Sequence, residues 1–353
     1  MYNTYYIETT PLNDFFESLK ERFRVFSPVV KSPQEKEINY IYQQSQPKSA
    51  MVFNAYRTVE PLKSFFTYPY ENVTGYFSPE KDITDIKEKV IVFGVKNCDL
   101  IGHKIQDFVF LEGVQVDSLY RAKRENTLII SGDCTDFKEV CHCLAWEILP
   151  YPNLGFDLNF SPLNDGYIIE AGSKKGEELL QSAQKYIVPA KETQLAARNV
   201  KRENLVDRLK RHLMPQNLVS RDSVQNLVKS GYSFDTWREF MLTCVECGGC
   251  NLICDTCHCF LLADKKTPAG NEKVRVWDAC LYANYARVAG GANPLKTRAQ
   301  RLRNRFMKKF DFFVDNLGMP ACCGCGRCIE VCPGKIDIRE VLKDLAKRLN
   351  STK

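Results

Sequence analysis

Two short stretches decide the fold of the C-terminal part of the chain: TCVECGGCNLICD at residues 243–255 and ACCGCGRCIEVCPG at residues 321–334. In both stretches four cysteines follow the same spacing, C-x2-C-x2-C-x3-C, with glycines between the sulfurs. The first run is Cys244, Cys247, Cys250 and Cys254, and the second run is Cys322, Cys325, Cys328 and Cys332. Such closely spaced thiolates, on loops that glycine allows to turn tightly, are typical of ligands for [4Fe–4S] clusters.

Two runs of this kind predict two clusters with crossed ligands. In two-cluster ferredoxins the fourth cysteine of each run ligates the cluster of the other run. The first cysteine set is therefore Cys244, Cys247, Cys250 and Cys332, and the second cysteine set is Cys322, Cys325, Cys328 and Cys254. The alternative is a zinc ribbon, which uses two C-x2-C pairs for one ion and would leave half of these cysteines unexplained.

Composition is consistent with a cytoplasmic protein of two or three domains. The chain has 353 residues, 44% of them hydrophobic, and 16 cysteines. Its N-terminus lacks a basic segment followed by an apolar segment, and its apolar runs are far too short to cross a bilayer. We expect no membrane association, and a reducing compartment in which clustered cysteines bind metal. The net charge of +6 neither requires nor excludes an acidic partner.

The sequence predicts an α/β domain over residues 1–195, a helical connector over 196–240 and a di-[4Fe–4S] ferredoxin-type domain over 241–353. In the first domain, short β-rich runs such as VIVFGV (90–95) and TLIISG (127–132) alternate with helix-like stretches. Leucines recur every fourth residue in the connector, which indicates an amphipathic helix. The last domain is expected to be mostly helical.

Between the cysteine runs lie two further helix-like segments, VRVWDACLYANYARVAG (274–290) and TRAQRLRNRFMKKF (297–310). This arrangement resembles the α-helical ferredoxin domain of succinate dehydrogenase iron–sulfur subunits. Residues 296–310 hold seven basic side chains and no acidic one. They could form a solvated helix face, raise a cluster potential, or dock an acidic partner. Nucleic-acid binding is disfavoured because no recognition motif accompanies the basic run.

Eight cysteines lie outside the two sets. Cys98 and Cys134 follow strand-like runs, so parallel strands would bring both to the carboxyl edge of a sheet. With Cys141 and Cys143 they could ligate a third cluster, although small buried cysteines without a ligand are common. Three more cysteines are Cys257, Cys259 and Cys280. Their favoured role is packing around the clusters, and the alternative is ligation or redox sensing. Cys323 is expected to point away from the cluster.

Several longer segments resemble one known family. They are IVFGVKNCDLIGHKIQDFVFL (91–111), SLYRAKRENTLIISGDC (118–134), CHC (141–143), GFDLNF (155–160), CVECGGCNLICDTCHC (244–259), WDAC (277–280), VAGGANPLKTRAQRLRNRF (288–306) and CCGCGRCIEVCP (322–333). In this order and spacing they are similar to the β subunit of cytoplasmic sulfhydrogenases and the A subunit of anaerobic sulfite reductase. The resemblance covers nearly the whole chain from about residue 50.

The resemblance implies an electron-transfer subunit of an anaerobic complex. Such a subunit connects a flavin-containing, NAD(P)H-oxidising subunit to a catalytic subunit of the hydrogenase, sulfite reductase or heterodisulfide reductase type. The family pattern also has cysteines at the positions of Cys98, Cys134, Cys141 and Cys143, which favours the third cluster. It includes Cys257, Cys259 and Cys280 as well, but not Cys323.

The sequence supports two other functions less well. A self-contained reductase would need a substrate or flavin site in the N-terminal domain, but no G-x-G-x-x-G follows a strand and no P-loop is present. A zinc-stabilised nucleic-acid-binding protein would rest on the basic run alone. We therefore expect an electron relay, with no substrate of its own and no catalytic residue.

Overall fold

The computed structural model describes residues 4–32, 34, 37–49, 51–75, 84, 86–268 and 270–351. The chain forms two compact units, each assembled from separate segments. The first unit consists of Met1–Phe66, Thr84–Glu139 and Leu149–Lys210, and the second of Thr67–Ile83, Val140–Ile148 and Arg211–Lys353. No helix in the described part of the chain is long and apolar enough to cross a membrane.

An eight-stranded mixed sheet forms the centre of the first unit. In spatial order its strands are β3 (Tyr40–Gln44), β2 (Arg24–Val30), β5 (Val90–Val95), β6 (Thr127–Gly132), β7 (Leu158–Pro162), β8 (Gly166–Ala171), β1 (Thr4–Glu8) and β9 (Val188–Pro189). The four neighbours β2, β5, β6 and β7 are parallel, whereas the other pairings are antiparallel. Strands β5 and β6 coincide with the two runs from which the sequence predicted an α/β fold, so this prediction is confirmed.

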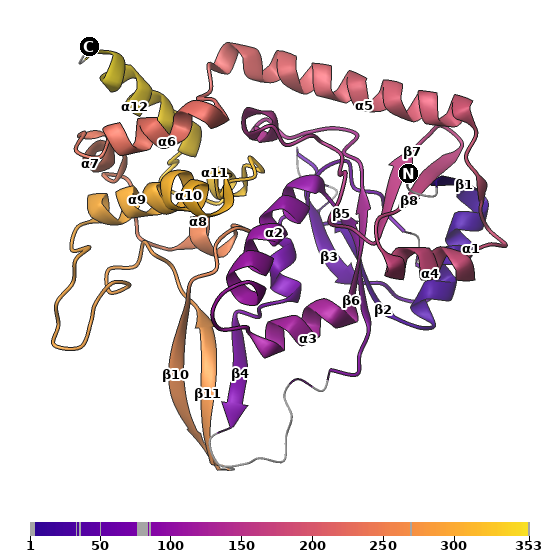
Figure 1. Cartoon of the computed structure of the whole chain (residues 1–353), viewed down its shortest axis with the longest axis horizontal. Helices are drawn as coiled ribbons and strands as arrows, with labels where there is room; N and C mark the ends of the chain where they lie inside the picture. The colour runs from indigo at the N-terminus through magenta and orange to yellow at the C-terminus, as the bar shows by residue number, and fades with distance from the viewer. Residues whose placement is uncertain are drawn as a thin grey trace. The chain divides into compact units, whose positions relative to one another are not determined.

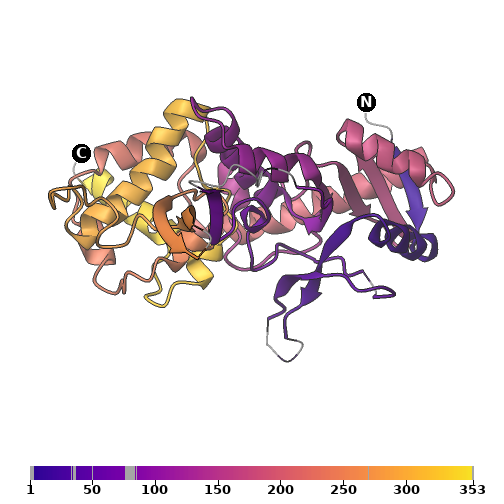
Figure 2. The same cartoon turned by 90° about the horizontal axis from the view of Figure 1, so that it is seen from below.

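Helices cover both faces of the sheet. Their bounds are α1 (Thr9–Lys20), α2 (Asn97–Leu111), α3 (Ser118–Asn126) and α4 (Lys174–Ser182), with a short helix η1 (Leu62–Phe65). Side chains of α1 and α4 pack with Phe93 of β5, whereas those of α2 and α3 pack with Val92, which points to the other face. Figure 1 shows α2 and α3 beside β5 and β6, and Figure 2 shows α1, in indigo, beside the sheet.

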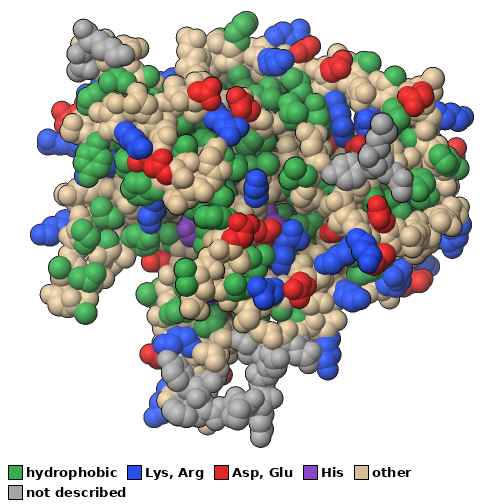
Figure 3. All heavy atoms as spheres, viewed as in Figure 1, with side chains coloured by type: hydrophobic (Ala, Val, Ile, Leu, Met, Phe, Trp, Pro, Cys, Tyr) green, Lys and Arg blue, Asp and Glu red, His purple; other side chains and the backbone are tan. Residues whose placement is uncertain are grey.

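The connector begins as one long helix, α5 (Glu192–Leu213). Its leucines at every fourth position, Leu205, Leu209 and Leu213, are buried, as the periodicity predicted. Arg202 attaches this helix to the sheet, because its guanidinium binds Asp133 at 2.7 Å and Glu170 at 3.0 Å. Along its exposed side, basic and acidic side chains are interspersed, as the upper edge of Figure 3 shows.

The second unit combines short helices with a three-stranded sheet. Its elements are β4 (Tyr70–Gly75), η2 (Cys143–Trp146), η3 (Met214–Gln216), α6 (Arg221–Ser230), α7 (Thr236–Phe240), α8 (Gly249–Leu252), β10 (Phe260–Thr267), β11 (Gly270–Trp277), α9 (Arg298–Met307), the π-helical turn η4 (Lys308–Phe312), α10 (Phe313–Leu317), α11 (Arg327–Glu330) and α12 (Ile338–Ser351). The antiparallel sheet has the order β10-β11-β4.

This sheet corrects the expectation of a helix over residues 274–290. Val274–Trp277 belong to β11 instead, and the residues after them form turns. The physical reason is a partner far away in the sequence. Arg275 is buried in β11 and its guanidinium binds the carboxylate of Glu71 in β4 at 2.6 Å. The other segment, 297–310, is helical as predicted, because Thr297 and Gln300 form a capping box at the start of α9.

The aromatic core under the large sheet generates the first prediction. Phe16 of α1 is 1% exposed and contacts the rings of Phe53, Phe93 and Phe160. Replacing it in Phe16→Ala should lower the free energy of unfolding by about 3–5 kcal/mol, because a buried ring leaves a cavity. Urea unfolding of the full chain measures this loss. The control Val200→Ala, at an exposed position of α5, should change it by less than about 0.5 kcal/mol.

Candidate iron–sulfur centres

The two cysteine runs repeat the same backbone conformation. Gly248 and Gly326 have φ angles of 70° and 74°, and each precedes a one-turn helix, α8 or α11. Two residues earlier, Glu246 and Gly324 also have positive φ angles, 57° and 64°. This left-handed conformation is favourable for glycine, which explains the glycines between the sulfurs. The repeat seen in the sequence is therefore a repeat of loop geometry.

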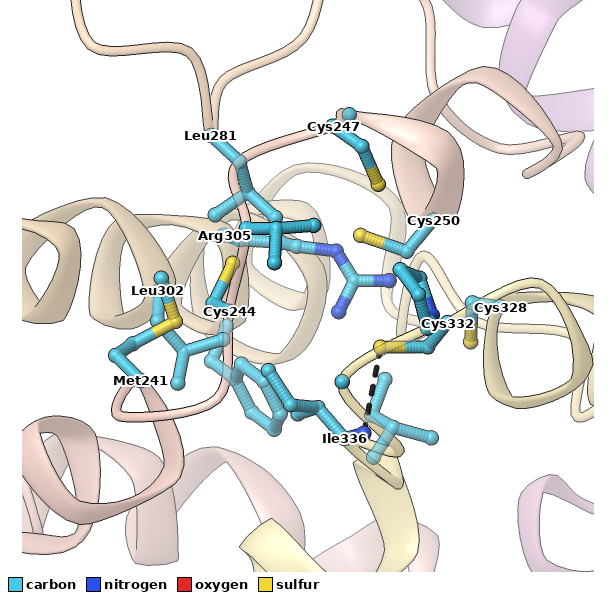
Figure 4. A pocket seen from close by; sticks show the side chains of 16 residues that line it. Met241, Cys244, Cys247, Cys250, Leu281, Leu302, Arg305, Cys328, Cys332 and Ile336 are labelled. Atoms are coloured by element: carbon cyan, nitrogen blue, oxygen red, sulfur yellow. Dashed lines mark hydrogen bonds between the residues drawn. The ribbon is translucent and has the colours of Figure 1, made fainter.

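The first cysteine set surrounds one pocket. Side chains of Cys244, Cys247 and Cys250 line it together with Cys332 and Cys328 from the other run. In Figure 4 these cysteines approach the pocket from two separate chain segments, and the guanidinium of Arg305 extends between them. Apolar side chains, Met241, Leu281, Leu302, Phe306, Ile336 and Ile338 among them, complete the lining. The pocket thus contains the four side chains of the first set and one cysteine of the second set, so the crossed assignment of ligands stays a prediction.

Backbone amides bind two sulfurs of the first set. The N–H of Glu246 donates to Cys244 Sγ over 3.4 Å, and the N–H of Ile336 donates to Cys332 Sγ over 3.3 Å. Burial raises the pKa of the Cys244 and Cys250 thiols above the ordinary value. Cys247, by contrast, is exposed. The first set therefore has one edge open to solvent.

In the second cysteine set, charged and hydroxyl groups converge on Cys254. The Nζ of Lys309 lies 3.3 Å from Cys254 Sγ, and the Thr256 hydroxyl lies 3.1 Å from the same sulfur. Lys309 also donates to Thr256 Oγ1 at 2.8 Å and to the carbonyl of Ala321 at 2.9 Å. These contacts fix the ammonium group of Lys309 next to the sulfur. The side chain is only 4% exposed.

Cys322 and Cys328 of the second set lie close enough to Cys254 for its charge to affect the pKa of both thiols. Burial raises the pKa of the Cys322 and Cys328 thiols to about 12, and the charge of Cys254 adds to both shifts. The pKa of Cys254 itself is lowered by a hydrogen bond from Cys257 and by the positive charge of Lys309. Without metal, Cys322 and Cys328 hold their protons at neutral pH. Metal ligation must therefore displace these protons.

Arg305 lies between the two sets. Burial alone would lower the pKa of its guanidinium, but the charges of Cys250 in the first set and Cys328 in the second raise it well above its usual value. Its Nε and Nη2 atoms have no hydrogen-bond acceptor among the described residues. A buried cation with unused donors fits a site that holds additional negative charge, as a thiolate-ligated cluster does.

The basic run is solvated only in part: Lys296 and Arg298 are exposed, whereas three of its seven basic residues are buried. Arg301, Arg305 and Lys309 are buried at intervals of four residues, which puts them on one side of α9 and η4. Arg301 binds Glu246 and three backbone carbonyls. Sequence reasoning missed Lys309 as a sulfur contact, although the four-residue spacing of these cations was visible.

The segment CHC at 141–143 packs against the second cysteine run. The N–H of His142 donates to the carbonyl of Gly324 at 2.8 Å, and a Cβ atom on Gly324 would lie 2.5 Å from the backbone of Cys143. Burial lowers the pKa of the His142 imidazole to about 4, so the ring is neutral. Cys141 and Cys143 are both buried and belong to the second unit.

Cys98 and Cys134 belong to the first unit. They follow the parallel neighbours β5 and β6, which places both at the carboxyl edge of the sheet, as expected. Between them Lys96 donates to the carbonyl of Asp133 at 2.9 Å. Burial lowers the pKa of Lys96, and the charges of Cys134 and Cys98 oppose that shift. The third cluster of Cys98, Cys134, Cys141 and Cys143 stays a prediction.

Three further cysteines gather around Asn251 and Tyr285. The Asn251 amide donates to Cys280 Sγ at 3.1 Å and to Cys257 Sγ at 3.7 Å, while Cys259 Sγ lies 3.6 Å from the Tyr285 hydroxyl. Cys257 also contacts Cys254 of the second set. Their expected role, packing around the cluster sites, stays a prediction. Cys323 is 2% exposed and is not among the residues that line the pocket of the first set.

The donor sets fit iron–sulfur clusters in their chemistry. Thiols line the first pocket, and a buried ammonium and a buried guanidinium compensate negative charge. Among the residues that the structure describes, no three Cys, His, Asp or Glu side chains converge closely enough to hold a single metal ion. The assignment of individual cysteines as ligands stays a prediction, and two substitutions test it.

Cys325→Ser and Cys323→Ser form a matched pair, because both sulfurs are buried and lie two residues apart. Cys325→Ser should remove about four irons per chain or convert the second cluster, since serine is a poor ligand for this cluster type. Cys323→Ser should leave the iron content unchanged. Iron and acid-labile sulfide are measured on anaerobically purified protein. Equal losses in the two variants would show that the ligands are misassigned.

Gly324→Ala tests the packing of the CHC segment. The added methyl group would meet the Cys143 backbone at 2.5 Å, in a conformation that already disfavours alanine. We expect loss of iron from the second set. Gly318→Ala is the control, because Gly318 has a similar φ of +66° with nothing within 4 Å of the added atom. An equal effect of both changes on iron content would mean that backbone strain, not this contact, is responsible.

Comparison with known proteins supports the same cofactor. Residues 243–336 match the family model described as a 4Fe-4S dicluster domain. The chain is also 30% identical over 339 residues to sulfhydrogenase 2 subunit beta of Pyrococcus furiosus, an alignment that spans 95% of this chain and 96% of the relative. The motif order, the gathered cysteines and this match lead to one conclusion. The chain belongs to the sulfhydrogenase β-subunit family and contains a 4Fe-4S dicluster domain.

Proposed function

We propose that the chain relays single electrons through two [4Fe–4S] clusters, held by the first and second cysteine sets. It would connect a flavin-containing, NAD(P)H-oxidising subunit with a catalytic subunit of the hydrogenase, sulfite reductase or heterodisulfide reductase type, in the cytoplasm of an anaerobe. The observation that carries the proposal is the pocket of the first set, which is lined by cysteines from both runs. When bound, such clusters supply one-electron redox chemistry.

The protein's own residues have three tasks in this function. The cysteines hold the iron, and the backbone N–H groups of Glu246 and Ile336 orient two of the sulfurs. Apolar side chains around the pocket, among them Leu302 and Phe306, exclude water. Arg305 offsets the negative charge of both sets. No proton donor or nucleophile is needed, because outer-sphere electron transfer breaks no bond of a substrate.

Exposure differs between the two sets in a way that suits a relay. Cys247 of the first set is exposed, whereas Cys254 and Cys325 of the second are buried. Leu242 and Val245, next to the first set in sequence, are 72% and 66% exposed. Electrons would therefore enter or leave through the first set, from a partner that covers this apolar edge. In fold, the proposal includes an α-helical ferredoxin-like arrangement of the cysteine-bearing helices.

The second candidate, a self-contained reductase, draws on a pocket in the first unit. Asp133, Cys134, Ser161, Arg198, Arg202 and Arg208 are among its lining residues. Three of its four cations are already engaged: Arg202 by Asp133, Arg198 by Glu170, and Arg208 by Asp136, while Lys201 is the fourth. Paired arginines offer little to the phosphate groups of a flavin or nucleotide. The pocket therefore favours a structural role over a cofactor site.

The test compares the isolated chain with the complex that it forms in its own cells. An affinity-tagged chain, purified anaerobically after mild and stringent washes, gives the complex and the single subunit. We expect the visible absorbance to bleach with NAD(P)H in the complex, but only with dithionite in the single subunit. Flavin retained by the single subunit, or its reduction by NAD(P)H, would favour the self-contained reductase instead.

Iron content separates two clusters from three. About eight irons per chain correspond to the first and second sets alone, and about twelve add the third cluster of Cys98, Cys134, Cys141 and Cys143. Cys98→Ser is the informative variant, because it should lower the iron content only in the second case. A chain without stoichiometric iron, or with zinc in its place, would contradict the proposed function.

A further inference from the structure

Backbone N–H groups donate to sulfurs of both cysteine sets, with Gly324 as the donor to Cys322, but the second set has a charged donor as well. Cys244 and Cys332 of the first set accept from neutral backbone N–H groups, at 3.4 and 3.3 Å. Cys254 of the second set accepts from the ammonium group of Lys309, at 3.3 Å. A charge-assisted donor interacts about twice as strongly as a neutral one. The second set is thus the one in which a positively charged group donates a hydrogen bond to a ligand sulfur.

The structure also fixes this charge in place. Lys309 is held by Thr256 Oγ1 and by the carbonyl of Ala321, the residue directly before Cys322. It lies in the π-helical turn η4, and such turns are frequent at functional sites because they shift side chains relative to the regular helix. Burial leaves little water to screen the ammonium group. Arg305, in contrast, interacts with sulfurs of both sets and does not distinguish them.

We propose that Lys309 gives the cluster held by the second cysteine set a higher reduction potential than the cluster held by the first set. An electron that enters the chain then resides mainly on the second-set cluster. This inference rests on the proposed function, because it needs a cluster at each set. Reduction adds one negative charge, and a fixed ammonium group next to a ligand sulfur stabilises the reduced form. The less exposed second set then holds the electron, while the more exposed first set exchanges it with partners. Lys309 acts through Cys254 and is a positioning residue, not a catalytic one.

Lys309→Met is the primary test, since methionine keeps the length of the side chain and removes the charge. The midpoint potential of the second-set cluster should fall by an amount that corresponds to at least tenfold in its reduction equilibrium, about 59 mV for one electron. The first-set midpoint should stay close to its original value. Both are measured by redox titration of the full chain, followed by EPR. Cys247→Ser, which alters the first set alone, identifies which signal belongs to which cluster.

Lys308→Met is the matched control, because the neighbouring ammonium binds the Tyr285 hydroxyl at 2.7 Å and no sulfur of the two sets in the described residues. It should leave both midpoints unchanged. Lys309→Arg, which keeps the positive charge, should restore most of the potential lost in Lys309→Met. If Lys309→Met shifts neither midpoint, or shifts both equally, the proposal is wrong.

If Lys309→Met loses its iron, Thr256→Val becomes the variant that tests the proposal. This change removes the hydroxyl that lies 3.1 Å from Cys254 Sγ and 2.8 Å from Lys309 Nζ, at almost constant volume. It should lower the same midpoint by a smaller amount, and an unchanged midpoint would overturn the proposal. Failure of the proposed function has a different signature: the unaltered chain would then lack two clusters altogether, before any potential is compared.

Discussion

Opposite charges buried together are the constraint on which the second unit depends. Arg305 and Lys309 are almost inaccessible to water, and burying a cation is costly unless an anion lies beside it. Cys254, whose pKa is lowered, provides part of that negative charge, and the other cysteines would provide the rest when they lose their protons on binding metal. The dependence is mutual, because the same cations make it less unfavourable to collect eight sulfurs in a small volume. Folding of this unit is therefore coupled to the chemical state of its cysteines.

The sequence predicts those parts of the structure that depend on neighbouring residues. Strands β5 and β6 were predictable because each is a short, buried, β-branched run. The repeated cysteine spacing was visible within each run, and the segment that forms α9 was recognisable as helix-like. In each case the signal lies within about fifteen residues of chain.

Features that depend on distant residues were not predictable. Strand β11 owes its position to β4 and to Glu71, 204 residues from Arg275. A local window containing VRVWDAC cannot distinguish a strand with such a partner from a helix. Likewise, seven basic residues in sequence do not reveal that Lys309 contacts a sulfur 55 residues earlier in the chain, while Arg303 stacks on the ring of Tyr232. Charge counts are local, but charge pairing is tertiary.

Because of the short CHC segment, the two units of this protein do not correspond to two continuous stretches of sequence. Although this segment lies a hundred residues before the first cysteine run, it belongs to the second unit, where His142 donates to Gly324 and Val140 packs against Gly326. A fragment that starts at the first cysteine run would contain all eight cysteines of the two sets but would leave the second loop uncovered. The iron-binding half of the chain is thus defined by its folding, not by a continuous stretch of sequence. Separation or exchange of the two halves would require cuts at both ends of residues 140–148 and of residues 67–83.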